Sequence, residues 1–418
     1  MKNRKLIALL MLTITVRLAA VFILNRHIVP EAWEYDILAK NMLSGKGYVM
    51  ANLHTDYRAL GYPLYAFISA GIYFLTNTNY FALELLNIIA SGFICYFVYA
   101  ITKKIYNNNG AGLIAAFIFA VHPGLIVYAT KLHELTLVAF FVCFVFWYLF
   151  ICDTQCRKDD FFFGIFIGLG ILLRPTLLFL LPAVILYRHI KFKPYIGKAI
   201  CSFFVMAVIC ASVIMPWIIR NYMIHKQLTF ITTSSAEHFW RGNNSFSTGT
   251  ALTKDKKCMF EVAPQSFLRR LYSLNEIGQY NLFYSETKKF VQKNPGFFLR
   301  MIARKFCFFW WFSPQTGLTY ASGWKYIYTY FYLFFAFFFL TGLFLSFASS
   351  SFRPYILPVC FFIAVVSLAH SFYYVETRHR WMVEPLMSVV AGFGVVNVVQ
   401  YLLLKFHFNK GKTASHPV

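Results

Sequence analysis

Long apolar runs separated by short basic segments constrain the fold of this chain more than any other feature. Hydrophobic residues make up 59% of the sequence and charged residues 13%, whereas an average soluble domain has about 25% charged residues. An apolar run of about 20 residues can cross a bilayer as a helix, because a helix satisfies its own backbone hydrogen bonds. The runs expected to do so are Leu6–Leu24, Phe81–Ile101, Ala111–Val127, Leu135–Ile151, Phe161–Leu173, Thr176–Tyr187, Ile200–Pro216, Tyr326–Phe347, Tyr355–His370 and Val383–Leu404. The sequence therefore predicts an all-α polytopic membrane protein.

Two of these runs and two further apolar pieces fit a bilayer less simply. Phe161–Leu173 and Thr176–Tyr187 are short for a hydrocarbon layer of about 30 Å and are expected to be tilted, broken or longer than these apolar runs. Pro63–Thr76 and Phe297–Phe312 would reverse the charge bias of every later loop if they crossed the membrane. We therefore expect these two pieces to lie along the membrane surface as interfacial helices, for which their aromatic residues are typical.

The basic residues of the chain follow its apolar runs. The formal net charge is +23, from 39 basic and 16 acidic residues. These basic residues do not form a stripe interleaved with stacking aromatics, so no nucleic-acid partner is indicated. Short basic clusters mark cytosolic loops, and here they are Lys2–Lys5, Lys103–Lys104, Arg157–Lys158, Arg188–Lys193, Arg353 and Lys405–Lys412. The sequence thus predicts a multi-pass plasma-membrane protein with both termini in the cytosol.

These assignments divide the chain into four parts. Residues 1–216 are expected to form an N-terminal transmembrane region whose first outer loop covers residues 25–80. Residues 217–321, rich in Ser, Thr, Asn, Lys and Glu over most of their length, are expected to form an extracytoplasmic loop domain with an interfacial helix. Residues 322–404 supply the C-terminal transmembrane helices and residues 405–418 a cytosolic tail. Every candidate polar site then faces the outer side.

Three carboxylates follow closely on the first apolar run, in a chain with only 16 acidic residues. They are Glu31, Glu34 and Asp36, and Glu134 begins a later run on the same predicted side. A partly desolvated carboxylate can act as a general base when it lies within about 2.6 to 3.2 Å of a hydroxyl. The alternative is that Glu31, Glu34 and Asp36 form the solvated first turn of a helix, where the helix dipole favours negative charge.

Arginines accompany these carboxylates on the same predicted side. A planar guanidinium can hold two phosphate oxygens at once, while its alternative role is to extend along apolar surface to the membrane edge. Arg17 lies inside the first run, where a charge is costly, and is a candidate for helix pairing or for function. The candidates for phosphate binding are Arg58, Arg174, Arg220, Arg378 and Arg380. Carboxylates and arginines beside a bilayer suit a phosphorylated lipid substrate.

Several of these residues belong to motifs that follow one another in a familiar order. The first outer loop reads Glu31-x-x-Glu34-Tyr35-x-x-x-Ala39-x-Asn41-Met42-Leu43-x-Gly45-x-Gly47-Tyr48, then Thr55-x-Tyr57-Arg58-x-x-Gly61-Tyr62-Pro63. Later motifs are His122-Pro123, Glu134, Leu172-Leu173-Arg174-Pro175, Pro216-Trp217-Ile218-Ile219-Arg220-Asn221-Tyr222, Gly242-Asn243-Asn244 and Glu376-Thr377-Arg378-His379-Arg380. Over nearly the whole chain this order resembles the GT-C glycosyltransferases. The branch it resembles contains the bacterial protein-mannosyltransferase-like and aminoarabinose-transferase-like enzymes, which use polyprenyl-phosphate sugars.

The resemblance implies a GT-C-like bundle of about ten transmembrane helices and an integral-membrane glycosyltransferase. Such an enzyme would move a hexose or pentose from a polyprenyl-phosphate-linked donor to an acceptor on the extracytoplasmic side. The acceptor, whether lipid, protein or cell-wall glycan, stays unassigned.

The resemblance also ranks the candidate residues. Glu31 is the first choice for the base and Glu134 the second. Glu34 and Asp36 are further catalytic candidates, for which a structural or metal-adjacent role is favoured when each is taken singly. Arg58 and Arg378 are the first choices for the donor phosphate, on which they would have to converge. Tyr35, Tyr62 and Trp217 are candidates for stacking on sugar or isoprenoid, with anchoring at the membrane interface as their alternative.

Two departures from the family pattern bear on these roles. Glu31 stands where an Asp is usual, so its part in the reaction is less firmly implied. Arg58-Ala59-Leu60-Gly61-Tyr62-Pro63 stands where Arg-Pro-Pro-Gly-Tyr-Pro is common.

A divalent metal ion is the one cofactor left open. Some enzymes of the superfamily bind such an ion, and His54, His133, His238 and His379 could join the carboxylates around it. No spacing among these histidines is typical of a metal site, so no ligands are assigned.

Two rival functions stand beside the enzyme. A transporter or flippase of lipid-linked sugars would also need arginines and aromatics, but an alternating path requires polar groups on both membrane faces. A non-catalytic membrane scaffold would explain the apolar runs but not the order of the motifs.

Overall fold

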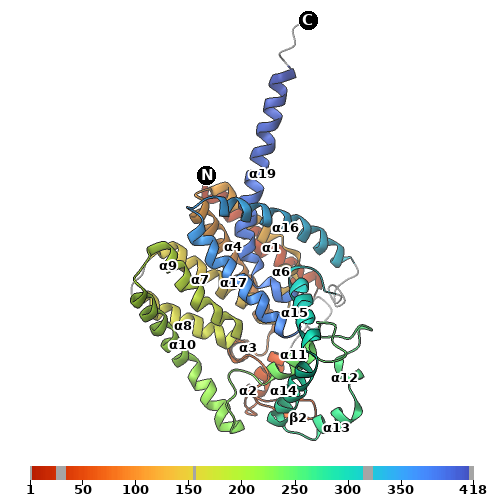
Figure 1. The fold of residues 1–418 in the computed structure, drawn as a ribbon. Helices are drawn as coiled ribbons and strands as arrows, with labels where there is room; N and C mark the ends of the chain where they lie inside the picture. The colour runs from red at the N-terminus through yellow and green to blue at the C-terminus, as the bar shows by residue number, and fades with distance from the viewer. Residues whose placement is uncertain (1, 25–33, 154–156, 314–322, 414–418) are drawn as a thin grey trace.

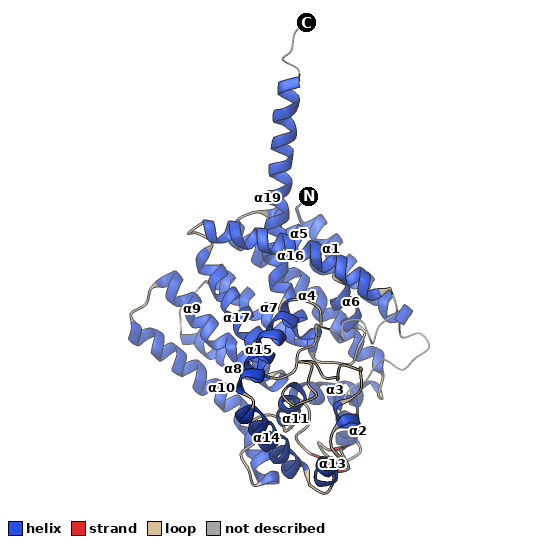
Figure 2. Ribbon diagram, turned by 45° about the vertical axis from the view of Figure 1, so that its right-hand side comes forward, coloured by secondary structure: helices blue, strands red, loops and turns tan. Residues whose placement is uncertain are grey.

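The chain forms a helix bundle with a smaller helical unit at one end. This computed structural model describes residues 2–24, 34–153, 157–313 and 323–413. α1 (Lys2–Leu24) begins and α19 (Glu384–Thr413) ends at the same end of the bundle (Figures 1 and 2). The opposite end, here called the loop face, carries α2 (Glu34–Leu43), α11 (Ser234–Gly242), α12 (Met259–Val262), α13 (Gln265–Tyr272) and α14 (Glu276–Lys293).

Eight helical segments in the described ranges are long and apolar enough to cross a membrane. They lie in α1, α4 (Tyr80–Tyr106), α7 (Leu135–Cys152), η1 (Pro175–Phe179) with α9 (Leu180–Phe192), α10 (Ile196–His225), α16 (Trp324–Ala348), α17 (Arg353–Phe372) and α19. The prediction of an all-α polytopic membrane protein is confirmed.

The expected span Ala111–Val127 is broken in the middle. It is divided between α5 (Asn109–Ala120) and α6 (Pro123–Ala129), which meet at an angle of 56°. Pro123 has no amide hydrogen to bond back into α5, and the side chain of His122 accepts a hydrogen bond from the Leu125 amide at the start of α6. If α5 and α6 are counted as one span, the described residues contain nine.

The two runs that are short in the sequence form different structures. Phe161–Leu173 lies in α8 (Arg157–Leu173), which has 17 residues and begins with four charged ones. Thr176–Tyr187 is part of a continuous apolar segment from Pro175 to Phe192, which is long enough to cross the membrane. The sixth expected span is therefore longer than predicted, and α8 is the short one.

α16 and α19 approach each other closely because each has a glycine at the contact. A Cβ atom on Gly342 would lie 2.1 Å from the carbonyl oxygen of Val390. A Cβ atom on Gly394 would lie 2.1 Å from that of Phe338. At these two positions the backbones leave no room for a side chain.

The charge of Arg17 is used inside the bundle. Its side chain is fully buried, and Nη1 donates to the carbonyl oxygens of Thr13 at 3.2 Å and Ala120 at 3.1 Å. Nη2 lies 3.4 Å from the carbonyl oxygen of Phe119. A cation is favourable at the carbonyl end of a helix, so these contacts support the helix-pairing role between α1 and α5.

The unit at the loop face has a hydrophobic core of its own. Its residues are Ala236, Trp240, Met259, Ala263, Leu268, Leu271, Leu282 and Phe283, all within the expected loop domain. β1 (Met50–Asn52) and β2 (Thr55–Tyr57) form an antiparallel hairpin in the first loop. Lys305 in α15 (Pro295–Trp310) donates to Asn243 Oδ1 at 2.8 Å and to the carbonyl oxygen of Tyr373 at 2.7 Å. α15 thereby ties the Gly242-Asn243-Asn244 motif to the end of α17.

α3 (Pro63–Thr76) and α15 each bury one face and expose another. α3 buries Tyr65 and Tyr73 and exposes Phe74. α15 buries Phe309 and exposes Phe306. Such faces suit the interfacial position expected for both helices.

Candidate functional site

Four segments at the loop face bring together two carboxyl groups and two arginines. Glu34 begins α2, Glu134 directly precedes α7, Arg174 directly follows α8, and Arg378 begins α18 (Arg378–Trp381). The charges of Glu134 and Arg378 both act on the pKa of Glu34, and Arg174 is paired with Glu134. These four residues, here called the polar cluster, are far apart in the sequence and meet only in the fold.

Glu134 and Arg174 form a buried ion pair. Arg174 Nη1 lies 3.2 Å from Glu134 Oε1, and Arg174 Nη2 lies 3.4 Å from Nε2 of His370. His133 Nδ1 lies 2.9 Å from Glu134 Oε2. Burial alone would raise the pKa of Glu134, but His133 and Arg174 outweigh it and lower that pKa to about 2. Glu134 is therefore ionised at neutral pH and already paired.

The pKa of Glu34 is shifted in the opposite direction. Its side chain is half-buried at the start of α2. Burial raises the pKa of Glu34 to about 7, and the negative charge of Glu134 adds to this rise while Arg378 opposes it. A general base works best when its pKa lies near the working pH. Glu34 is thus tuned to gain and lose a proton near neutrality.

Arg378 is held beside neutral histidines. Its Nε lies 2.9 Å from Glu376 Oε2, and its Nη1 donates to the hydroxyl of Tyr128 at 3.2 Å. Burial, together with nearby positive charge that includes Arg378, lowers the pKa of His238 to about 3 and that of His379 well below its usual value. Neutral imidazoles can donate hydrogen bonds to an anion without adding charge.

Two further members of this neighbourhood escaped the sequence analysis. His370 bonds to Arg174, and its ring centroid lies 4.8 Å from that of His379. The ring centroid of Tyr374 lies 5.6 Å from that of His379 and 5.3 Å from that of His238. The available signal was their position just before the Glu376–Arg380 motif, at the end of an expected span.

Of the three stacking candidates, two lie near the polar cluster. Tyr35 is buried and packs edge-on against Tyr65, with ring centroids 4.9 Å apart. Burial raises the pKa of Tyr62, on which the charges of Arg174 and Glu134 also act. Trp217 packs edge-on against Tyr48, and its Nε1 donates to the carbonyl oxygen of Ile231 at 2.8 Å.

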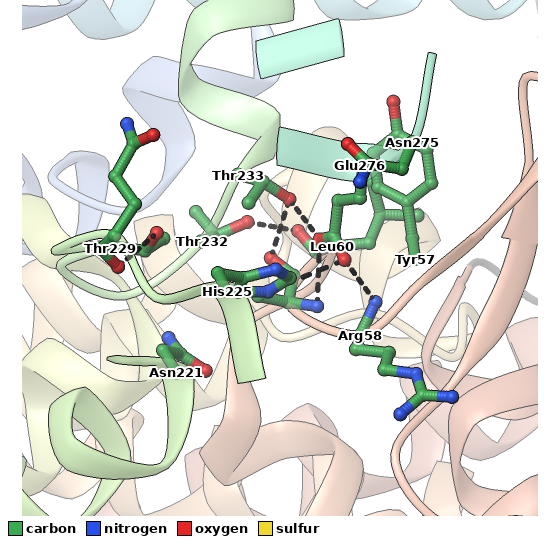
Figure 3. Close-up of polar contacts among 12 residues, drawn as sticks. Tyr57, Arg58, Leu60, Asn221, His225, Thr229, Thr232, Thr233, Asn275 and Glu276 are labelled. Atoms are coloured by element: carbon green, nitrogen blue, oxygen red, sulfur yellow. Dashed lines mark hydrogen bonds and ion pairs between the residues drawn. The ribbon is translucent and has the colours of Figure 1, made fainter. Parts of the chain in front are cut away.

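Arg58 and Arg220 belong to a second group of contacts. Arg220 donates to the carbonyl oxygens of Arg58 and Tyr48, and its guanidinium lies 4.6 Å from the ring centroid of Trp217. The Arg58 side chain is exposed, and Figure 3 shows its guanidinium turned away from Glu276, whose carboxylate accepts the Arg58 amide.

The side chains of Arg380 and Asp36 bond to other residues of the protein. Arg380 is fully buried, pairs with Glu384, and donates to the carbonyl oxygen of Phe309 at 2.6 Å and to the hydroxyl of Tyr328 at 2.7 Å. Asp36 accepts from Lys40 and from the hydroxyl of Tyr73, both at 2.8 Å, which ties α2 to α3. These contacts hold both side chains in place, and their predicted roles in phosphate binding and catalysis stay predictions.

Glu31, the first choice for the base, falls in residues 25–33 and lies outside the described residues. Within the described ranges, no group of three or more His, Cys, Asp or Glu residues is arranged to hold a metal ion. A metal site built with Glu31 would therefore include residues that the structure does not describe.

Comparison with known proteins places the fold. Residues 60–219 match the family described as dolichyl-phosphate-mannose-protein mannosyltransferase, while no curated protein sequence matches significantly. The oligosaccharyltransferase AglB from Archaeoglobus fulgidus, in complex with an inhibitory peptide and a dolichol-phosphate, superposes with a TM-score of 0.54 at 11% identity, over 98% of this chain and 52% of that one. ArnT from Cupriavidus metallidurans bound to undecaprenyl phosphate gives a TM-score of 0.57 at 12% identity, over 92% and 59%.

The chain spans little more than half the length of these two proteins. At identities of 11% and 12%, the similarity between this chain and these two proteins is one of fold. Together with the sequence match, they confirm the resemblance that the ordered motifs indicate. The protein is thus a polytopic membrane protein with the fold of the GT-C glycosyltransferases, and its residues 60–219 carry the pattern of the mannosyltransferase family.

Proposed function

We propose that this protein is a membrane glycosyltransferase that takes a sugar from a polyprenyl-phosphate-linked donor and passes it to an acceptor hydroxyl at the loop face. The observation that carries the proposal is the polar cluster, in which Arg174 is paired with Glu134 and the charges of Glu134 and Arg378 act on Glu34, whose pKa is raised to about 7. The mannosyltransferase pattern and the lipid phosphates bound by AglB and ArnT support this class of donor.

In the proposed reaction a carboxylate removes the proton of the acceptor hydroxyl, and the oxygen attacks the anomeric carbon of the sugar. The bond from that carbon to the phosphate oxygen breaks, and the polyprenyl phosphate leaves with the electron pair. Arg174 and Arg378 stabilise the charge that develops on the leaving phosphate. Arg58 adds a third guanidinium from the first loop, an assignment that rests on its motif position.

Two carboxyl groups three positions apart in the sequence are the candidates for the base. Glu31 is favoured by its motif position and Glu34 by its raised pKa. Glu134 is assigned a different role, because it is already paired with Arg174 and holds that guanidinium in place.

The loop face is proposed to lie outside the cytosol. The short basic clusters between the apolar runs lie mainly on the opposite side of the expected topology, where lysine and arginine favour the cytosol. A divalent ion remains part of the proposal only with a ligand from residues 25–33, and turnover measured before and after chelation tests it.

Turnover of a lipid donor distinguishes a glycosyltransferase from a flippase of lipid-linked sugars. Purified protein incubated with a polyprenyl-phosphate hexose or pentose and cell-envelope acceptors should release free polyprenyl phosphate. The Arg174→Ala/Arg378→Ala double variant should not. A flippase would move the donor across the bilayer of a vesicle without splitting it, and that outcome would contradict the proposal.

A further inference from the structure

Glu276 is a buried carboxylate to which the sequence motifs assign no role. It lies in the first turn of α14, where Asn275 caps the helix by accepting from the Gly278 amide at 3.0 Å. Only 3% of its surface is exposed. Burying a carboxylate costs free energy unless it is well hydrogen-bonded, so its partners should account for its position.

Those partners come from the first loop and from the segment before α11. Glu276 Oε2 accepts from the Arg58 amide at 2.6 Å, and Oε1 accepts from the Ala59 amide at 2.9 Å (Figure 3). Oε1 also accepts from the hydroxyl of Thr233 at 2.6 Å, and the Thr233 amide donates to the carbonyl oxygen of Ala59 at 2.8 Å. His225, at the end of α10, lies 3.5 Å away through Nε2. One carboxylate therefore joins three segments.

The result is that the backbone of Arg58 is fixed on both sides. Glu276 holds its amide, and Arg220 donates to its carbonyl oxygen. The side chain of Arg58 is exposed, and no hydrogen bond or ion pair to its guanidinium occurs among the residues that the structure describes. The contacts thus fix the backbone position of Arg58 and leave its guanidinium available for a ligand.

We propose that Glu276 is a positioning residue, which aims the Arg58 guanidinium at the phosphate of the lipid donor. This inference rests on the proposed function, in which Arg58 contributes to phosphate binding. A long arginine loses conformational freedom when it binds, and a fixed backbone lowers the remaining cost of bringing its fork to the anion. The competing explanation is that Glu276 only holds the loop-face unit against the first loop.

A double-mutant cycle separates these explanations. Glu276→Gln keeps the shape but presents an NH₂ group to one of the two backbone amides, so one hydrogen bond is lost. We expect this variant to raise KM for the donor about tenfold with a smaller change in kcat. In an Arg58→Ala background the same substitution should change KM less than threefold, because its effect passes through Arg58.

Controls keep the cycle interpretable. Glu286→Gln, on the same helix but paired among the described residues with Arg270 and Lys289 alone, should leave both constants unchanged. If Glu276→Gln does not fold, Thr233→Val removes one donor to the same carboxylate and should give a smaller effect with the same dependence on Arg58. Equal losses from Glu276→Gln with and without Arg58 would overturn the positioning role.

A second readout does not depend on catalysis. A spin label at Arg58→Cys, in a background free of other cysteines, should become more mobile with Glu276→Gln and should not change with Glu286→Gln. Unchanged mobility would reject the inference even if the protein transfers sugar. If the label responds but no polyprenyl phosphate is released, the proposed function fails while the control of the Arg58 backbone stands.

Discussion

At the residue scale, the pKa values of two glutamates in the polar cluster are shifted in opposite directions because their neighbours differ. Glu134 has a cation at hydrogen-bond distance and a pKa of about 2, whereas Glu34 is half-buried near a second negative charge and has a pKa of about 7. Pairs of carboxyl groups with separated pKa values are typical of sites that carry out proton transfer. The sequence identified both residues, but their ranking depended on contacts that only the fold creates.

The raised pKa of Glu34 predicts a pH dependence. A base must be deprotonated, and a carboxyl group is protonated below its pKa, so turnover should rise with pH through about 7 if Glu34 is the base. Glu34→Gln should then reduce turnover about 10²-fold or more and abolish this acid limb. The measurement is a pH profile of kcat/KM for the donor, which reports the pKa values of the free protein. Near-normal turnover with an unchanged limb would move the role to Glu31, whose Gln variant should then show the loss.

The two arginines of the polar cluster predict a loss on replacement by lysine. Lysine keeps the charge of Arg378 but not the fork that holds two phosphate oxygens. We expect Arg378→Lys and Arg174→Lys each to lower turnover about tenfold, or roughly 1.4 kcal/mol, at low and high salt alike. The double variant should lose less than the product of the singles. Arg300→Lys, exposed on α15, serves as the control. Losses that disappear in salt would indicate general attraction of an anionic lipid.

At the scale of elements, hydropathy located most of the membrane helices, because long apolar runs have few alternatives in a bilayer. It did not foresee the 56° break between α5 and α6, although His122-Pro123 was noted as a motif. A proline can kink a helix or start a new one, and the outcome here includes a cap by His122. The Glu276 contacts were beyond the sequence because they join α14 to a loop more than two hundred residues earlier.

The glycine contact between α16 and α19 predicts a large effect from a small substitution. Gly394→Ala would place Cβ 2.1 Å from the carbonyl oxygen of Phe338, so the helices would have to separate. Forced overpacking of this kind costs about 1 to 3 kcal/mol. Thermal unfolding in detergent should show a lowered midpoint. Gly71→Ala in α3, where a Cβ meets nothing within 4 Å, should be neutral or stabilising by up to about 1 kcal/mol.

At the scale of the whole molecule, the fold class was predictable and the assembled site only partly so. Apolar runs determine a helical bundle on their own, and ordered motifs indicated Arg174, Arg378 and Glu134. The sequence could not assign neighbours: the bonds of the Arg58 backbone to Glu276 and Arg220 have no signal in it, and the convergence of Arg58 with Arg378 on one phosphate stays a prediction. Which arginines share a phosphate depends on helix packing that hydropathy does not encode.

The predicted orientation can be tested by labelling. In a cysteine-free background, a reagent that cannot cross membranes should modify Ser245→Cys on intact cells or spheroplasts, because Ser245 is exposed on the loop-face unit. Lys193→Cys, exposed between α9 and α10, should be protected until the membrane is opened. The reverse pattern would place the polar cluster in the cytosol.

α10 is longer than the hydrocarbon layer of a bilayer is thick. It has 30 residues, or about 45 Å of helix at 1.5 Å per residue, against a hydrocarbon layer of about 30 Å. Its projecting end carries Arg220 and His225, which contact the Arg58 carbonyl and Glu276, and Pro216 interrupts its hydrogen bonding below them. A change in bilayer thickness alters helix tilt. A change in the tilt of α10 would move its C-terminal end and with it the first loop. The acyl-chain length of the surrounding lipids should for that reason change the rate of the proposed sugar transfer.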